Sequence, residues 1–211
     1  MYLRVTSRPD ICAAVNYFAG FQCCASEEHW VHLKRVLRYL RGTADHQLVY
    51  RRTESEQLVV FADADWGTDV NDRKSVSGLV IKLYGQTVAW STKKQSSVAL
   101  SSTEAELMAL CQASCEVMWI VNLLRSVQWE VSEPISVFED NQPCISVVLD
   151  PRKLKRMKHI EVQYHFLKEL IEKGKLVLKY LETGEQLADM MTKGLPAPRF
   201  RKFRDMLGVV N

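Results

Sequence analysis

The chain has 211 residues and a formal net charge of +3, and 47% of its residues are hydrophobic and 25% charged. This composition is typical of a folded globular protein and excludes an intrinsically disordered chain. The length suits one good-sized domain, or a compact domain with an appendage. So small a net charge does not by itself indicate an anionic partner, so local clusters of charge matter more than their sum.

The cysteines and the apolar segments bear on the compartment. The six cysteines form no Cys-x-x-Cys pair and no spacing typical of a zinc site. We interpret them as free thiols in a reducing compartment. No N-terminal segment resembles a signal peptide, and no continuous apolar run approaches the length of a transmembrane helix. The sequence therefore predicts an intracellular protein without a membrane partner.

Residues 1–43 carry the pattern of amphipathic helices. The first follows Pro9, with apolar residues at helical spacing. The second begins at Ser26, a favourable N-cap residue, has acidic residues in its first turn, and ends in basic residues and Gly42. Helices this short need a partner surface on which to bury their apolar faces. We therefore expect this segment to be an appendage of a larger domain.

From about residue 46 the pattern changes to short apolar segments that are typical of strands. The predicted strands are 46–52, 57–62, 78–84, 87–91, 135–138 and 176–181, with Gly85-Gln86 as a hairpin turn. The predicted helices are 102–127, a short one after Asn141, 157–173, and one opened by a capping box at Thr183-x-x-Gln186. This order predicts an α/β fold in which helices cover a mixed sheet.

Two aspartates end the predicted strand 57–62. Asp63 and Asp65 are two residues apart, and such residues share one face of a strand. Neighbouring carboxylates repel each other unless a cation neutralises them. The sequence thus favours a cation site at this strand end, and the alternative is a strand that simply breaks into a polar turn.

Glutamates near the start of the predicted helix 102–127 differ in their position around the helix. Glu106 falls near the middle of the apolar stripe, whereas Glu104 falls on its flank. A carboxylate inside a packed stripe is unfavourable unless a cation pairs with it. Helical phase therefore favours Glu106 as a functional residue, although exposure in the first helical turn would also account for it.

Two further aspartates have ordinary structural explanations that require no functional role. Asp140 lies between a predicted strand and a helix, where Asp is among the preferred N-cap residues, and capping does not exclude metal binding. Asp189 lies within the helix that we expect after Thr183. A solvent-facing aspartate is the default expectation there.

Several motifs follow one another in an order that is specific to one family. They are Ala62–Trp66, Asp72–Ser75 with Gly78, Ser101–Ala109, Glu139–Asn141, Lys158–Ile160 with Tyr164–Phe166, and Gln186–Asp189 with Thr192-Lys193. Together they resemble the ribonuclease H domain of copia-type long-terminal-repeat retrotransposon Pol polyproteins. Upstream, Arg8–Asp10, Ala14–Asn16 and Lys34–Leu40 resemble the end of the reverse transcriptase region.

The resemblance implies a domain organisation. Residues 1–45 would be the helical C-terminal remnant of the reverse transcriptase or connection region, and 46–195 a ribonuclease H-like domain with a mixed five-stranded sheet flanked by helices. Residues 196–211 would form a C-terminal helical tail. A chain so organised would be a C-terminal piece of the polyprotein.

The resemblance also implies a site. The family's acidic tetrad, which is both catalytic and metal-binding, falls on Asp63, Glu106, Asp140 and Asp189. Asp65 remains a competitor for the first position. Asp63 is preferred because the ribonuclease H pattern is a strand ending in one aspartate that is followed by a small residue.

One departure from the cellular enzymes concerns histidine. Those enzymes place a histidine in the loop before the last helix, and residues 181–188 contain none. His159 and His165 lie earlier, on a predicted helix, and neither is assigned that role. Proton transfer or product release would therefore be handled differently.

Oxygen ligands suit hard divalent cations, so we expect two Mg²⁺ ions, for which Mn²⁺ can substitute. The resemblance implies an endonuclease that hydrolyses the RNA strand of RNA–DNA hybrids during reverse transcription, in contact with the reverse transcriptase portion of the same polyprotein. The expected location is a cytoplasmic retroelement particle or the nucleus. The alternative is a catalytically decayed or fragmentary domain that only tethers nucleic acid, and strand-transfer chemistry would require a different acidic spacing.

Candidate nucleic-acid contacts lie around the predicted site. By resemblance, Ser101, Ser102 and Thr103 would contact the 2′-hydroxyl groups of RNA. The basic residues Arg73, Lys74, Lys93, Lys94 and the segment Arg152–Lys158 would contact phosphates, and the alternative for these is a solvated basic surface. For Trp66 and Trp90 we favour core packing over stacking on bases.

Overall fold

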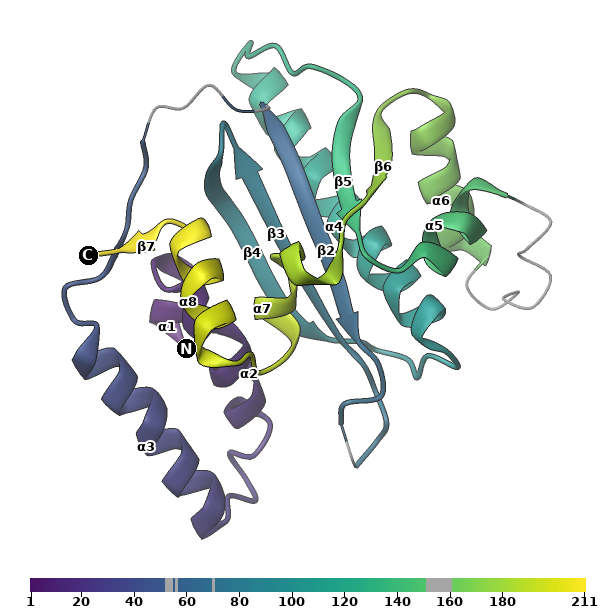
Figure 1. The fold of residues 1–211 in the computed structure, drawn as a ribbon. Coiled ribbons are helices and arrows are strands. Elements are labelled where there is room, and N and C mark those ends of the chain that lie inside the picture. Colours follow the sequence, from purple (N-terminus) through teal and green to yellow (C-terminus); the bar gives the residue numbers. More distant parts are fainter. Residues whose placement is uncertain (52–54, 56, 70, 151–160) are drawn as a thin grey trace.

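The computed structural model describes residues 1–51, 55, 57–69, 71–150 and 161–211, and in this part of the chain a mixed sheet is the largest element (Figure 1). Its strands are β2 (Leu58–Asp65), β3 (Val76–Leu83), β4 (Gln86–Lys94), β5 (Ile135–Glu139) and β6 (Leu176–Tyr180), in the order β4-β3-β2-β5-β6. The first three are antiparallel neighbours, whereas β5 joins β2, and β6 joins β5, in parallel. The predicted α/β fold with a five-stranded mixed sheet is confirmed.

One face of the sheet is covered by α4 (Ser102–Ser126), α5 (Gln142–Leu149) and α6 (Glu161–Glu172) (Figure 1). Leu107 and Leu110 of α4 pack with Val60 of β2 in the main hydrophobic core. By length and composition α4 could cross a membrane, but half of its most apolar window is buried inside the fold. It is the core helix of the domain.

The other face is covered by segments from both ends of the chain. They are α1 (Tyr2–Thr6), the 3-10 helix η1 (Pro9–Ile11), α2 (Cys12–Ala19), α7 (Asp189–Thr192) and α8 (Ala197–Met206). Their second core joins Cys12 and Phe203 to Val80 of β3. Helices α1, η1 and α2 from the N-terminal part of the chain and α8 from the C-terminal part therefore lie in the same layer.

A buried ion pair fastens the N-terminal segment. Arg8 and Asp10 lie 2.8 Å apart with almost no solvent exposure. Tyr39 of α3 (Glu27–Gly42) donates a 2.6 Å hydrogen bond to Asp10, and Arg8 donates a 2.8 Å bond to Thr43. Ser26 caps α3 as predicted. No residue of α3, all of which the structure describes, is buried, so its apolar stripe lacks most of the partner surface that we expected.

Two predicted elements are wrong. The segment 46–52 was expected to form a strand of the sheet, but in its described part only β1 (Gln47–Leu48) is extended, and it pairs with β7 (Val209–Val210) in a separate ribbon. Thr183 opens no capping box, because residues 183–185 form a short 3-10 helix, η4, without a side-chain cap. The Gln186 side chain is instead buried and donates a 3.0 Å hydrogen bond to the Ala62 carbonyl oxygen.

Four predictions fall wholly or partly on residues 151–160. The basic segment Arg152–Lys158, His159 and the motif Lys158–Ile160 all lie outside the described residues. The predicted helix 157–173 is described from Glu161, where α6 begins.

Candidate metal centre

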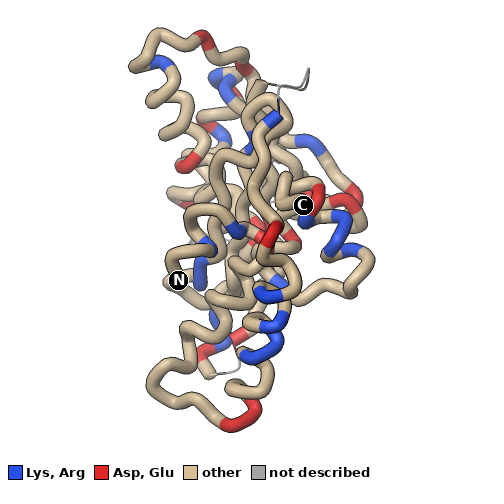
Figure 2. The backbone as a smooth tube through the Cα atoms, turned by 90° about the vertical axis from the view of Figure 1, so that its left-hand side faces the viewer, with Lys and Arg blue, Asp and Glu red and all other residues tan. Residues whose placement is uncertain are grey.

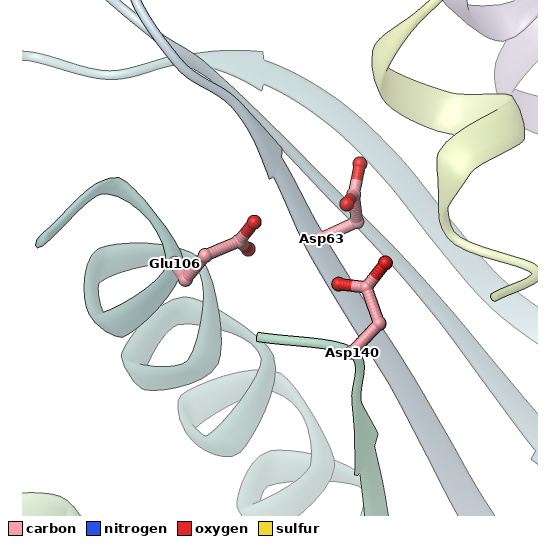
Figure 3. Close-up of side chains that lie close together, drawn as sticks. All are labelled: Asp63, Glu106 and Asp140. Carbon is pink, nitrogen blue, oxygen red and sulfur yellow. The ribbon is translucent and has the colours of Figure 1, made fainter. Parts of the chain in front are cut away.

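Three of the four predicted carboxylates converge at one end of the sheet (Figure 3). Asp63 comes from β2, Glu106 from the first turns of α4, and Asp140 directly follows β5. Each offers an oxygen atom that lies within 4.8 Å of those of the other two. Asp63 and Asp140 meet because β2 and β5 are parallel neighbours, so their carboxyl ends lie at the same edge.

The convergence takes place in a buried, negatively charged environment. Burial, followed by the charge of Asp189, raises the pKa of Asp63 to about 7. Burial, followed by the charge of Glu139, raises the pKa of Glu106 far above its ordinary range. Glu106 Oε2 is buried and finds no hydrogen-bond partner among the described residues. Acidic oxygens that face one another, one of them buried without a hydrogen-bond partner among the described residues, form a donor set that fits a hard divalent cation.

The competing carboxylates have other surroundings. Asp65 is half-buried at the end of β2 and does not belong to the converging group. Glu104 is as well buried as Glu106, at 2% against 6% exposure, so burial does not separate the two glutamates. Their partners do, because Glu104 Oε2 accepts a 2.8 Å hydrogen bond from the Leu100 backbone N–H at the start of α4. Asp63 and Glu106 thus belong to the converging group, and Asp65 and Glu104 do not, while the roles of these residues stay predictions.

Asp189 lies beside this group. The sequence led us to expect that it faces solvent, but the structure buries it. It is the first residue of α7 and is fully buried. Its Oδ1 lies 2.8 Å from Lys193 Nζ, and its Oδ2 accepts a hydrogen bond from Arg199 Nη2. Lys193 Nζ also lies 3.7 Å from Asp63 Oδ2. The fourth predicted carboxylate is thus ion-paired at both oxygens.

Side chains without an assigned role complete the surroundings. The Thr192 hydroxyl donates a hydrogen bond to Asp63. Glu139 is fully buried, its Oε1 accepts a 3.0 Å bond from the Asn141 N–H, and burial raises its pKa. Asn141, rather than Asp140, caps α5, which leaves the Asp140 carboxylate free for another role. A glutamate at the end of a mainly apolar strand was a signal for Glu139, whereas nothing in the sequence pattern pointed to Arg199.

The basic residues that were predicted to contact phosphates differ in exposure and in ion pairing. Arg73 and Lys93 are exposed, but Lys94 pairs with Asp69 and with Asp72, the latter at 3.0 Å. Lys74 lies 3.8 Å from Asp72. These pairs reduce the positive charge that the β4 end presents to an anion. The phosphate contacts remain predictions.

The serine and tryptophan predictions have different outcomes. The Ser101 hydroxyl caps α4 by accepting a 3.2 Å bond from the Glu104 N–H, while Ser102 is exposed and Thr103 half-buried. Trp66 is 52% exposed, so core packing is wrong for this residue. Trp90 is half-buried against the second core and donates a 2.6 Å hydrogen bond to the Arg4 carbonyl oxygen.

A basic surface that the sequence analysis did not assign lies on α3. Figure 2, in which this side of the molecule faces the viewer, shows acidic residues at the start of the helix and basic residues along the rest of it. The basic residues of α3 are Lys34, Arg35, Arg38 and Arg41. Their arrangement follows the helix dipole, which favours acidic residues at the first turn and basic ones at the last.

Comparisons with known proteins place the chain in a family, although no protein-family model matches it. It is 37% identical over 209 residues to the retrovirus-related Pol polyprotein from transposon RE2 of Arabidopsis thaliana, covering 99% of the chain and 14% of the polyprotein. It is 34% identical over 209 residues to the Pol polyprotein from transposon TNT 1-94 of Nicotiana tabacum, covering 99% of the chain and 16% of that protein. The chain therefore spans only a small part of these relatives.

A shorter protein is similar to part of the chain. Secreted RxLR effector protein 161 of Plasmopara viticola is 48% identical over 120 residues, which cover 57% of the chain and 84% of the effector. This match leaves more than two fifths of the chain without a counterpart, whereas the polyproteins match nearly all of it.

Among solved structures, LC11-RNase H1, isolated from compost, aligns with a TM-score of 0.51 and 18% sequence identity. The alignment covers 70% of the chain and 98% of that protein. At 18% sequence identity, this similarity is evidence for a shared fold alone. The chain is thus homologous, over nearly its whole length, to a part of the retrovirus-related Pol polyproteins of transposons, and it carries a domain with the ribonuclease H fold.

Proposed function

We propose that this chain is a metal-dependent endonuclease that hydrolyses the RNA strand of RNA–DNA hybrids during reverse transcription of a retrotransposon. The observation that carries the proposal is the convergence of Asp63, Glu106 and Asp140, in which a buried Glu106 oxygen lacks a protein partner among the described residues. The ribonuclease H fold and the kinship with transposon Pol polyproteins support the same substrate class.

Asp63, Glu106 and Asp140 would hold divalent metal, with Asp189 as a fourth ligand, and two Mg²⁺ ions or Mn²⁺ in their place suit these oxygen donors. When bound, such ions lower the pKa of attacking water and stabilise the charge on the leaving oxygen. The tetrad would therefore act both as metal ligands and as the catalytic residues.

The remaining residues of the site would position these carboxylates and the substrate. Thr192 orients Asp63 through its hydroxyl group. Glu139 holds the Asn141 N–H and thereby fixes the chain on either side of Asp140. Lys193, whose ammonium group lies beside Asp63 and Asp189, adds positive charge where a phosphate would approach.

Contacts to nucleic acid form a further part of the proposal. Ser101, Ser102 and Thr103 would read the 2′-hydroxyl groups that distinguish RNA from DNA. Arg73, Lys74, Lys93 and Lys94 would contact backbone phosphates, each adding a salt-sensitive increment to binding. The reverse transcriptase portion of the polyprotein would be the partner, in a cytoplasmic retroelement particle or in the nucleus.

The test is cleavage of a hybrid whose RNA strand is labelled, with Mg²⁺ present. We expect Asp140→Asn to lower the rate by at least roughly 100-fold, since changes merely in the outer shell of a metal site cost 10- to 100-fold. Asp65→Asn is the matched control, because Asp65 ends the same strand as Asp63 but lies outside the converging group, and it should retain most of the activity. Full cleavage by Asp140→Asn would reject the proposal.

The second candidate function is a tether that grips nucleic acid without cleaving it. The observation in its favour is the ion pairing of Asp189 by Lys193 and Arg199, which neutralises one carboxylate of the tetrad. Binding of the hybrid that is independent of metal, with no turnover at any Mg²⁺ concentration, would support the tether over the nuclease.

A further inference from the structure

The C-terminal helix α8 sends a side chain into the carboxylate centre. Phe203 of α8 is fully buried in the second core, and the Arg199 guanidinium lies over its ring at 4.9 Å. The neighbouring Phe200 makes an edge-to-face contact with Tyr39 of α3, at 5.5 Å between ring centroids. Packing on both sides thus fixes the first turn of α8, from which Arg199 extends.

Arg199 reaches two acceptors from this position. Its Nη2 donates to Asp189 Oδ2 and to the Thr183 carbonyl oxygen. The side chain is only 26% exposed, so the pair with the fully buried Asp189 is largely shielded from water. An ion pair in such surroundings is screened far less than a surface pair, and a divalent ion that used this carboxylate would have to compete with it.

Lys193 engages the other side of the same carboxylate. Its Nζ lies 2.8 Å from Asp189 Oδ1 and 3.7 Å from Asp63 Oδ2, so it stands between the fourth carboxylate and the converging group. Asp189 is accordingly outside the set whose oxygens lie within 4.8 Å of one another. The centre has two unlike parts, a cluster that lacks a counter-charge at Glu106 and a carboxylate already neutralised by two cations.

We propose that Arg199 and Lys193 are positioning residues that hold Asp189 as an ion pair and weaken divalent-cation binding at the Asp189 side of the centre. The inference rests on the proposed function, because it concerns the same metal site. It makes metal loading stepwise: the first ion binds at Asp63, Glu106 and Asp140, and a second ion uses Asp189 only after Arg199 has released it. α8 would thereby control how completely the centre loads.

The experiment is a titration of the whole chain with Mn²⁺. Calorimetry and the electron paramagnetic resonance signal of free Mn²⁺ measure the binding. Arg199→Gln should tighten the weaker Mn²⁺ site by roughly fivefold or more, the lower end of typical coupling between two sites. Arg199→Lys keeps the charge and should tighten it less. Arg201→Gln, an exposed change on the same helix, should leave both affinities unchanged.

A melting curve shows whether each variant is folded, and a second variant covers the case in which Arg199→Gln is not. Should Arg199→Gln unfold when metal is removed, Lys193→Gln, which leaves Arg199 in place, should show the same tightening. Unchanged or weaker Mn²⁺ binding in both glutamine variants would overturn the inference. If wild type cleaves the hybrid and neither glutamine variant changes Mn²⁺ affinity, the inference is refuted and the proposed function stands. If the variants bind Mn²⁺ more tightly but wild type does not cleave the hybrid, the proposed function is refuted and the inference stands.

Discussion

Gly78 of β3 lies directly opposite Asp63 of β2 in the antiparallel register of the sheet. A Cβ atom at Gly78 would stand 2.7 Å from both Met191 Cβ and Thr192 Cγ2 and 2.9 Å from the Ala188 carbonyl oxygen. Glycine therefore lets α7 lie against the strand next to Asp63. This close approach brings the Thr192 hydroxyl and Asp189 to the metal centre.

Gly78→Ala should displace α7. The new methyl group would meet backbone and Cβ atoms that cannot turn away, and overpacking of this kind costs about 1–3 kcal/mol in free energy of unfolding. Urea unfolding should show this lower free energy of unfolding, and the variant should bind Mn²⁺ more weakly than wild type. Gly194→Ala is the control, because a Cβ there meets nothing within 4 Å. Equal stability and metal affinity in the two variants would contradict this role of Gly78.

The stability of the metal-free protein should depend on the protonation of Asp63. Its pKa is raised to about 7, so between the ordinary pKa of an aspartate and pH 7 the folded state binds more protons than the unfolded state. The contribution is therefore fully present below about pH 4 and is lost as the pH rises through 7. In EDTA, the difference in unfolding free energy between wild type and Asp63→Asn should change across this window. A difference that is constant with pH would contradict it.

Metal binding should show the opposite pH dependence. A divalent ion must displace the protons that burial and repulsion keep on Asp63 and Glu106. The rise in melting temperature on adding Mn²⁺ should thus be larger at pH 8 than at pH 6, and calorimetry in two buffers should detect proton release. An equal rise at both pH values would count against a site made of these carboxylates.

Gln186 joins the two strands that carry Asp63 and Asp140. Its Nε2 donates to the carbonyl oxygens of Ala62, at 3.0 Å, and of Phe138, at 3.4 Å. Gln186→Leu keeps the volume but removes the donor, which should cost about 1–3 kcal/mol because a buried acceptor loses its partner. Urea unfolding measures the loss. Gln142→Leu, on the exposed start of α5, should cost far less, and similar losses would argue against this bridge.

The buried Arg8–Asp10 pair should fasten α3 to the rest of the fold. Asp10→Ala leaves the Arg8 guanidinium buried without its counter-charge, and breaking such a pair costs about 3–5 kcal/mol. Hydrogen exchange should report the loss first in α3, which Tyr39 connects to Asp10. Asp45→Ala, at an exposed position, is the control. Unaltered exchange in α3 of the Asp10 variant would contradict this account.

Periodicity predicted the sheet strands and α4 closely, because long apolar patterns leave little choice of element. The predicted helix 102–127 and the observed α4, Ser102–Ser126, differ by one residue. Helical phase also singled out Glu106, although Glu104 proved equally buried and differs in that it accepts a hydrogen bond from the Leu100 N–H and lies outside the converging group. That distinction depends on how the chain enters the helix, which a residue pattern does not contain.

The errors concern places where distant segments meet. The Thr183–Gln186 pattern fits a capping box locally, but the Gln186 side chain instead satisfies a carbonyl oxygen 124 residues away in sequence. Asp189 was expected to face solvent, but its carboxylate pairs with Lys193 one helical turn away and with Arg199 of the distant helix α8. Local patterns carry no information on such pairings, which arise only once both ends of the chain have packed on the same face.

The most direct test of the central claim uses the unaltered chain and substrates that differ only in their sugars. With Mg²⁺, an RNA–DNA hybrid should lose its RNA strand, leaving 5′-phosphate and 3′-hydroxyl ends, while its DNA strand and an all-DNA duplex stay intact, and EDTA should stop the reaction. Folded protein that binds the hybrid in Mg²⁺ but leaves the RNA strand uncut would contradict the claim.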